Sequence, residues 1–223
     1  MTEYVVDIER DVIIPCDTIY LEGLLIVPKE AIGIVLFAHG SGSSRFSSRN
    51  QLIAKVLQQS NIATLLFDLL TSEEDKIDTH TQEYRFNIEL LAARLLAATN
   101  WVLTQPALQK LPIGYFGAST GGGAALLAAA QEQELIKAVV SRGGRPDLAG
   151  AALRRVKSPT LLLVGGHDET VMMLNQQAFE ELHCTKTLTI IPGATHLFEE
   201  PGKLAEVAKL AEEWFTIYLN HRL

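Results

Sequence analysis

Cysteine is nearly absent from the sequence, and this scarcity narrows the classes of protein that it can encode. Among 223 residues there are only two cysteines, Cys16 and Cys184, which lie far apart with neither a CxxC motif nor metal-ligand spacing. A disulfide-stapled scaffold or a cysteine-ligated metal site is therefore not expected. We predict instead that each cysteine is a small buried or half-buried side chain.

An excess of basic charge and a long apolar segment are also missing. The 19 Lys and Arg residues are outnumbered by 26 Asp and Glu residues, giving a net charge of -7, and they form no basic stripe. We therefore expect neither a nucleic-acid nor a membrane partner. The longest apolar helical stretch, residues 90–98, is interrupted by Arg94 and is too short to span a bilayer. Residues 1–4 show no secretory signal, so a cytoplasmic protein is expected.

Internal repeats, low-complexity tracts and Gly-, Ser- or Pro-rich linkers are absent as well, which indicates a single domain over residues 1–223. With 48% hydrophobic residues, the chain can bury one substantial core. Strand-like and helix-like segments alternate after an N-terminal antiparallel hairpin, which predicts an α/β fold with a mostly parallel, doubly wound sheet of about eight strands. The charged and polar residues 68–81 are expected to form a long loop. The strands are expected at residues 5–14, 19–27, 32–38, 62–67, 111–116, 136–140, 160–164 and 187–191, and the helices at residues 49–59, 82–103, 120–133, 171–182 and 203–219.

Ser119 lies between the expected strand 111–116 and an Ala-rich helix, within the sequence Gly-Ala-Ser-Thr-Gly. Glycines on both sides of a serine allow a sharp strand-to-helix turn that projects the hydroxyl group. The helix that follows aims free backbone N–H groups and its positive dipole end at the same point. The pattern predicts a nucleophilic serine, although such a serine is often only a helix cap.

Asp168 and His196 follow the last two expected strands, at the edge of the sheet where Ser119 is also expected. The order serine, aspartate, histidine is the chain order of the α/β-hydrolase triad. In this interpretation His196 takes the proton of Ser119, and Asp168 orients the imidazole and stabilises its charged form. The structural alternatives are that Asp168 caps a turn and that His196 is a surface residue.

The loop His39-Gly-Ser-Gly-Ser after the first parallel strand is expected to complete an oxyanion hole. Its glycines free the backbone to point an N–H group into the site, and we assign this donor to Ser41, with Gly42 as the alternative. The other donor is the backbone N–H of Thr120, beside the nucleophile. His39 is expected to brace the loop.

These segments together resemble the dienelactone hydrolase type of the α/β-hydrolase superfamily, from about residue 24 to residue 219. The resemblance rests on the sequences around His39, Ser119, Asp168 and His196. Dienelactone hydrolases proper carry cysteine where this chain has Ser119, so a general esterase or thioesterase activity is as plausible as lactone hydrolysis. The chain has no insertion long enough for the cap domain of many relatives, which implies an open site.

Arg142 and Arg145 follow the expected strand 136–140 and so begin at the same edge of the sheet. A guanidinium group suits carboxylate or phosphate recognition, so one hypothesis is that either arginine binds an anionic group of the substrate. The alternative is that they brace loops by pairing with Asp147, Glu199 or Glu200.

The sequence leaves three classes of function. The first is hydrolysis of a small-molecule ester, lactone or thioester through an acyl-Ser119 intermediate, which requires no metal and no organic cofactor. The second is acyl transfer or lyase chemistry with the same triad, and the third is a non-catalytic binding module. The intact triad argues against the third class. The oligomeric state cannot be deduced from the sequence.

Overall fold

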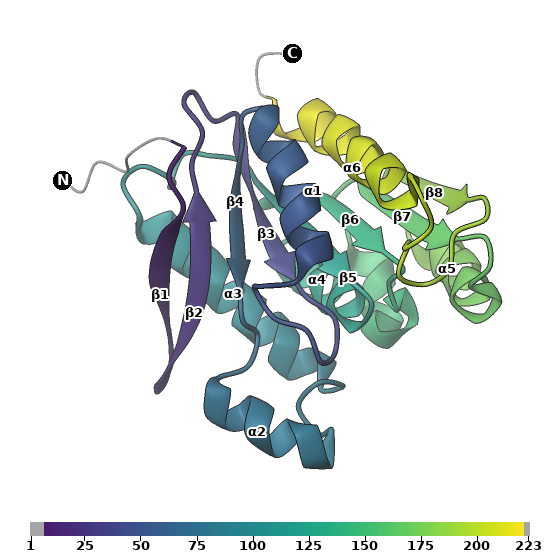
Figure 1. Ribbon diagram of the computed structural model, residues 1–223, viewed down its shortest axis with the longest axis horizontal. Helices are drawn as coiled ribbons and strands as arrows, with labels where there is room; N and C mark the ends of the chain where they lie inside the picture. The colour runs from purple at the N-terminus through teal and green to yellow at the C-terminus, as the bar shows by residue number, and fades with distance from the viewer. Residues whose placement is uncertain (1–6, 221–223) are drawn as a thin grey trace.

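The computed structural model, which describes residues 7–220, has one eight-stranded sheet at its centre (Figure 1). The strands are β1 (Arg10–Cys16), β2 (Ile19–Ile26), β3 (Gly33–Ala38), β4 (Ile62–Phe67), β5 (Ile113–Ala118), β6 (Ile136–Arg142), β7 (Thr160–Gly165) and β8 (Lys186–Ile191). They lie in the order β1-β2-β4-β3-β5-β6-β7-β8. The pairs β1–β2 and β2–β4 are antiparallel, and all pairs from β4 to β8 are parallel. The expected α/β fold with an N-terminal hairpin at the edge of a mostly parallel sheet is confirmed.

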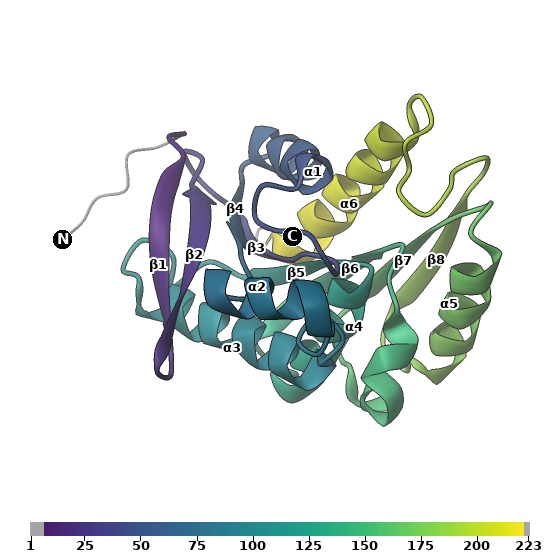
Figure 2. The same cartoon turned by 60° about the horizontal axis from the view of Figure 1, so that its bottom comes forward.

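Helices cover both faces of the sheet, as Figure 2 shows. They are α1 (Ser48–Gln59), α2 (Ser72–Thr81), α3 (Ile88–Thr104), α4 (Thr120–Gln131), α5 (Glu169–Glu181) and α6 (Lys203–Leu219), with a 3-10 segment η1 (Pro146–Arg155). One apolar layer lies between the sheet and α1 and α6, and the other lies between the sheet and α3, α4 and α5. No helix within residues 7–220 is long and apolar enough to cross a bilayer.

The central strands are buried because both of their faces are covered. Every residue of β3, β4, β5 and β7 is buried, which explains why these strands are continuous apolar runs in the sequence. β4 lies on one side of β3 and β5 lies on the other. The chain therefore leaves the ends of β3 and β5 in opposite directions, toward β4 and toward β6. Such a reversal of strand order opens a crevice at the carboxyl ends of the strands, where ligands bind in open α/β sheets.

The expectation of a long loop over residues 68–81 is wrong, because α2 occupies most of it. A capping box starts this helix: the Thr71 hydroxyl accepts from the Glu74 backbone N–H (3.2 Å), and the Glu74 carboxylate accepts from the Thr71 N–H (2.8 Å). The next helix begins at Ile88 rather than at residue 82, with Asn87 as its N-cap. The sequence signal for α2 is therefore its cap rather than apolar periodicity, since only Asp78 is buried in it.

The hairpin also differs in its boundaries from the expectation. A two-residue turn, Asp17-Thr18, joins β1 to β2, and Pro15 lies inside β1. Proline is tolerated there because β1 is an edge strand whose outer side needs no hydrogen-bond partner. Residues 5 and 6 of the expected first strand, and residues 1–4, lie outside the described residues.

Candidate active site

Ser119 lies on a sharp turn between β5 and α4. Its backbone angles are φ 51° and ψ −122°, a conformation that costs a non-glycine residue on the order of 1–3 kcal/mol. The turn is held in place because its glycines permit very close backbone approach. A Cβ atom on Gly121 would lie 2.1 Å from the carbonyl oxygen of Ala38, and one on Gly117 would lie 2.4 Å from that of Gly121. Strain at Ser119 is thus imposed by tight packing of α4 against the ends of β3 and β5.

Asp168 and His196 meet at the carboxyl edge of the sheet. The Nδ1 atom of His196 lies 2.5 Å from Oδ2 of Asp168. An ionised carboxylate only accepts hydrogen bonds, so Nδ1 carries the proton and Nε2 is left as the basic nitrogen. Backbone contacts hold the two loops together: the N–H of His167 donates to the carbonyl of Ala194 (2.9 Å). A Cβ atom on Gly165 would lie 2.5 Å from that same Ala194 oxygen.

Ser119 and His196 line one cavity of about 210 Å³. The structure therefore brings together the predicted nucleophile and the imidazole that Asp168 orients. No hydrogen bond joins Ser119 to His196 within residues 7–220. Catalytic hydrogen bonds of this kind are often long before substrate binds.

The loop after β3 lies against the nucleophile. The N–H of Ser43 donates to the carbonyl of Gly40 (3.2 Å), which closes a turn with Ser41 and Gly42 at its centre. Gly42 has φ +67°, a value that favours glycine at the third position of a turn. A Cβ atom on Gly40 would lie 3.1 Å from Cβ of Ser119. Across from this turn, Thr120 is the first residue of α4, so its backbone N–H has no partner within the helix.

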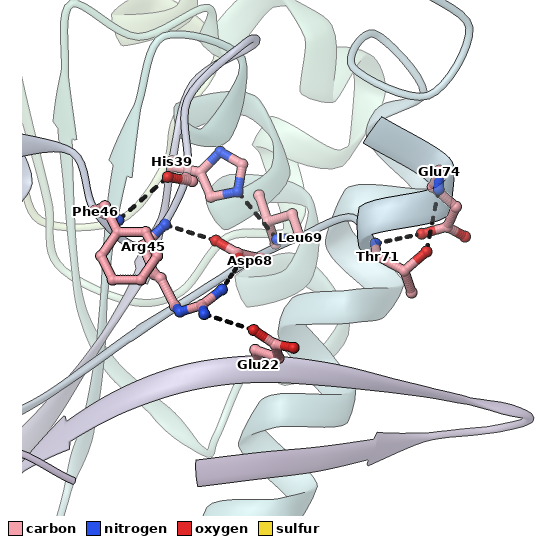
Figure 3. A network of polar contacts seen from close by, with 9 residues as sticks. Glu22, His39, Arg45, Phe46, Asp68, Leu69, Thr71 and Glu74 are labelled. Atoms are coloured by element: carbon pink, nitrogen blue, oxygen red, sulfur yellow. Dashed lines mark hydrogen bonds and ion pairs between the residues drawn. The ribbon is translucent and has the colours of Figure 1, made fainter. Parts of the chain in front are cut away.

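His39 braces this loop, as Figure 3 shows. Its Nε2 accepts from the backbone N–H of Leu69 (3.0 Å), and its Nδ1 lies 2.9 Å from the carbonyl oxygen of Gly40. Both contacts are satisfied by a neutral ring with its proton on Nδ1. Burial lowers the pKa of His39 below its ordinary value, against the opposing effect of the hydrogen bond to Gly40. The imidazole is therefore a structural link between the loops after β3 and β4.

The loop after β4 is fixed further by Arg45, which joins Asp68 and Glu22 (Figure 3). A second, smaller cavity of about 100 Å³ lies between the Gly40–Ser43 turn and the loop after β4. Its lining includes His39, Thr120 and Arg85. It does not include Ser119.

The two predicted arginines have different surroundings. Arg145 forms a two-point ion pair with Asp147, with N–O distances of 2.8 and 2.7 Å. Within residues 7–220, Arg142 makes no hydrogen bond or ion pair through its side chain, although it is only 7% exposed. Arg142 lines the cavity that holds Ser119. Burial and the nearby charge of Arg49 lower the pKa of Arg142 to about 10.

Arg49, in the first turn of α1, lines the same cavity and was not singled out by the sequence. Its guanidinium group lies 3.5 Å from the carboxylate of Glu199, a residue on the loop after His196. Its position could not be inferred from a motif, because it depends on how α1 packs over the sheet. Among residues 7–220 no cluster of three or more His, Cys, Asp or Glu side chains could hold a metal ion.

Comparison with known proteins shows the family and agrees with the fold. A model of the dienelactone hydrolase family matches residues 21–220. The structure of a dienelactone hydrolase from Anabaena variabilis ATCC 29413 is 58% identical, with a TM-score of 0.93 over 94% of this chain and 97% of that one. Est1E from Butyrivibrio proteoclasticus with bound ferulic acid shares the fold, at 20% identity and a TM-score of 0.80 over 93% of this chain and 99% of that one.

Two curated relatives come from strains of Mycobacterium tuberculosis and carry the provisional name phosphoribosyl transferase. Each is 54% identical over 211 residues, which make up 95% of this chain but 47% of the relative. The chain thus spans about half the length of the curated relatives that it matches.

Proposed function

Since the chain belongs to the dienelactone hydrolase family, we propose that it is a serine hydrolase that cleaves a small-molecule ester, lactone or thioester through an acyl-Ser119 intermediate. The observation that carries this proposal is the Asp168–His196 contact of 2.5 Å at the cavity that Ser119 lines. The fold and the family support hydrolase chemistry in general. The site geometry supports the serine mechanism, and the ester-type bond is part of the proposal.

The proposed reaction has two halves. In the first, Nε2 of His196 accepts the proton of Ser119 while Oγ attacks the substrate carbonyl, and the same proton then goes to the leaving alcohol or thiol. In the second, water loses a proton to Nε2 and attacks the acyl carbonyl, and the proton returns to Ser119 as the acid departs. Asp168 holds the ring in the required tautomer throughout.

The negative oxygen formed in each half needs hydrogen-bond donors. We assign these to the backbone N–H groups of Thr120 and Ser41, which lie on α4 and on the turn that packs against Ser119. Gly42 is the next N–H along the turn and is the alternative second donor. The close approach of Gly40 supports this assignment, because a Cβ atom there would lie 3.1 Å from Cβ of Ser119, so the turn lies beside the proposed nucleophile.

The size of the cavity favours a small substrate. About 210 Å³ is below the usual 300–1,000 Å³ of sites for drug-sized ligands. Leu197 and Ala118 supply apolar lining, and the rest of the lining is mostly polar or glycine. A short acyl group is therefore the expected partner of Ser119.

The transferase name of the curated relatives does not argue against hydrolysis by this chain. The match takes in 95% of this chain and so includes most of residues 21–220, which the dienelactone hydrolase model covers, and more than half of each relative lies outside the match. We propose that phosphoribosyl transfer, in those relatives, belongs to the part of the relative that lies outside the match.

The decisive experiment is labelling with a fluorophosphonate probe followed by peptide mass spectrometry. We expect one adduct on Ser119, its loss in Ser119→Ala, and parallel loss of hydrolysis of short p-nitrophenyl esters. Cys184→Ser is a matched control, because burial raises the pKa of that thiol and makes it a poor nucleophile. Folded wild-type protein that takes no label on Ser119 would refute the proposal. Adding hydroxylamine to the assay separates hydrolysis from acyl transfer, since transfer makes the hydroxamate the main product.

A further inference from the structure

The strand alternation of β6 directs Arg142 toward the face of the sheet that α1 and α6 cover. Along β6, Ala138 and Val140 pack in the layer under α1 and α6, whereas Val139 packs in the opposite layer. Successive side chains of a strand point to opposite faces, so Arg142 follows Ala138 and Val140. Its guanidinium group therefore ends beside the first turn of α1, where Arg49 lies in the same cavity.

The two arginines leave positive charge and donors unsatisfied within this cavity. Among residues 7–220, Nη1 of Arg142 and Nε of Arg49 are buried without a hydrogen-bond partner. Within the described part of the chain, the one acidic partner of the two arginines is Glu199, which lies 3.5 Å from Arg49 and has a side chain that is 65% exposed. In a chain with a net charge of -7, carboxylates are plentiful, yet none pairs with Arg142 within residues 7–220.

Further donors surround this pair of charges. Ser43 and Ser47 line the cavity, and Ser47 is the N-cap of α1. The N-terminus of a helix carries partial positive charge and free N–H groups. Asn50, in the first turn of α1, lines the cavity and has a buried side-chain oxygen without a partner. Exchange of its amide nitrogen and oxygen would present one more donor.

We propose that Arg142 and Arg49 bind a phosphoryl group of the substrate, so that the enzyme hydrolyses a small phosphorylated ester, lactone or thioester. The proposal rests on the serine-hydrolase function proposed above and names its substrate class. A phosphate monoester fits better than a carboxylate for two reasons. It carries nearly two negative charges against the two guanidinium groups, and its three free oxygens can meet more of the donors.

The first test compares three esters that differ only in the charged group: the butyryl esters of 2-hydroxyethyl phosphate, of 3-hydroxypropanoate and of 2-methoxyethanol. We expect the highest kcat/KM for the phosphate ester. A neutral ester that is hydrolysed as well as the phosphate ester overturns the proposal. A preference for the carboxylate ester overturns the phosphoryl assignment.

Arginine variants tie the preference to the site. Arg142→Met and Arg49→Gln should each lower the ratio of kcat/KM for the phosphate ester over the neutral ester about ten- to hundredfold, as expected for a lost charge-assisted hydrogen bond. Arg154→Ala removes an exposed arginine that pairs with Glu181, and it should leave the ratio unchanged. An equal loss on both esters in Arg142→Met and Arg49→Gln refutes the assignment. Arg49 is half-buried at a helix start, so Arg49→Gln decides the question if Arg142→Met does not fold.

Binding of inorganic phosphate separates this proposal from the hydrolase proposal. Ser119→Ala should still be stabilised by phosphate in thermal unfolding, and more than by the same concentration of acetate at equal ionic strength, while Arg142→Met should lose this effect. Phosphate binding without any hydrolysis or labelling refutes the serine mechanism but supports the anion site. Labelling and hydrolysis without phosphate stabilisation of Ser119→Ala refute the anion site alone.

Discussion

Replacing Arg142 by methionine should stabilise the folded protein while it impairs the enzyme. Arg142 is 7% exposed, and its Nη1 has no partner. Burial of an unpaired charge is unfavourable, and an apolar side chain of similar length avoids that cost. Methionine suits this position because it is unbranched and adapts to irregular space.

The size of the effect follows from the pKa of Arg142. Burial and Arg49 lower this pKa from its ordinary value to about 10, which at about 1.4 kcal/mol per pH unit corresponds to about 3 kcal/mol. Folded and unfolded chains both carry the charge below about pH 10, so the full cost is present at neutral pH. Imperfect packing of the new side chain offsets roughly 1 kcal/mol of the gain. We therefore expect the free energy of unfolding to rise by about 2 kcal/mol and Tm to rise by roughly 4–8 °C.

The assay is urea and thermal unfolding of wild type, Arg142→Met and Arg145→Met in phosphate-free buffer at pH 7. Arg145→Met is the matched control, because it removes an arginine that lies three residues after Arg142 and is paired with Asp147. It should leave the free energy of unfolding unchanged or lower it by up to about 1 kcal/mol. Added phosphate should narrow the difference between wild type and Arg142→Met by stabilising the wild type. A lower stability of Arg142→Met than of wild type would mean that Arg142 has stabilising partners, and the reasoning would be wrong.

Three further predictions concern the turn at Ser119, the triad, and the His39 contacts that link the loops after β3 and β4. Gly121→Ala places a Cβ atom 2.1 Å from the carbonyl oxygen of Ala38, so it should lower the free energy of unfolding by roughly 1–3 kcal/mol and prevent fluorophosphonate labelling; normal labelling would contradict this. Asp168→Asn should lower kcat for p-nitrophenyl esters about 10⁴-fold, because an amide disfavours the tautomer that leaves Nε2 of His196 basic, and a loss below tenfold would argue against the triad. Because the pKa of His39 is lowered in the folded protein, the unfolded chain takes up the proton first. Stability should therefore be full above about pH 6.5 and should fall as the pH decreases below it, and urea unfolding should show a flatter pH dependence in His39→Gln.

The sequence predicts the framework of the site because the rules that place it are local. A glycine-flanked serine after a buried strand indicates the turn at Ser119, and strand ends indicate Asp168 and His196. The structure brings Ser119 and His196 to one cavity and Asp168 to the imidazole. The resemblance to dienelactone hydrolases is confirmed over residues 21–220.

What the sequence does not predict depends on packing between distant segments. α2 has little apolar periodicity, so its existence depends on the Thr71 cap and on contacts with other elements. One of these is the ion pair of Glu74 with Arg94 on α3, at 2.7 Å. Arg49 reaches the site only because α1 packs over the carboxyl edge of the sheet. The contrast between Arg142 and Arg145 also depends on tertiary structure, since Arg142 is buried at the cavity that Ser119 lines, whereas Arg145 is more exposed and pairs with Asp147.

Two unfavourable features of the fold meet at one cavity. The backbone of Ser119 is in a strained region, and the charge of Arg142 is buried without a partner. Together they cost several kcal/mol, a large fraction of the roughly 5–15 kcal/mol by which a domain is stable. The arginines Arg45 and Arg145, in contrast, are each paired with nearby carboxylates. Because these arginines find carboxylate partners in the same acidic chain, the unpaired charge of Arg142 supports the proposed anionic ligand, which would pair with it when substrate is bound.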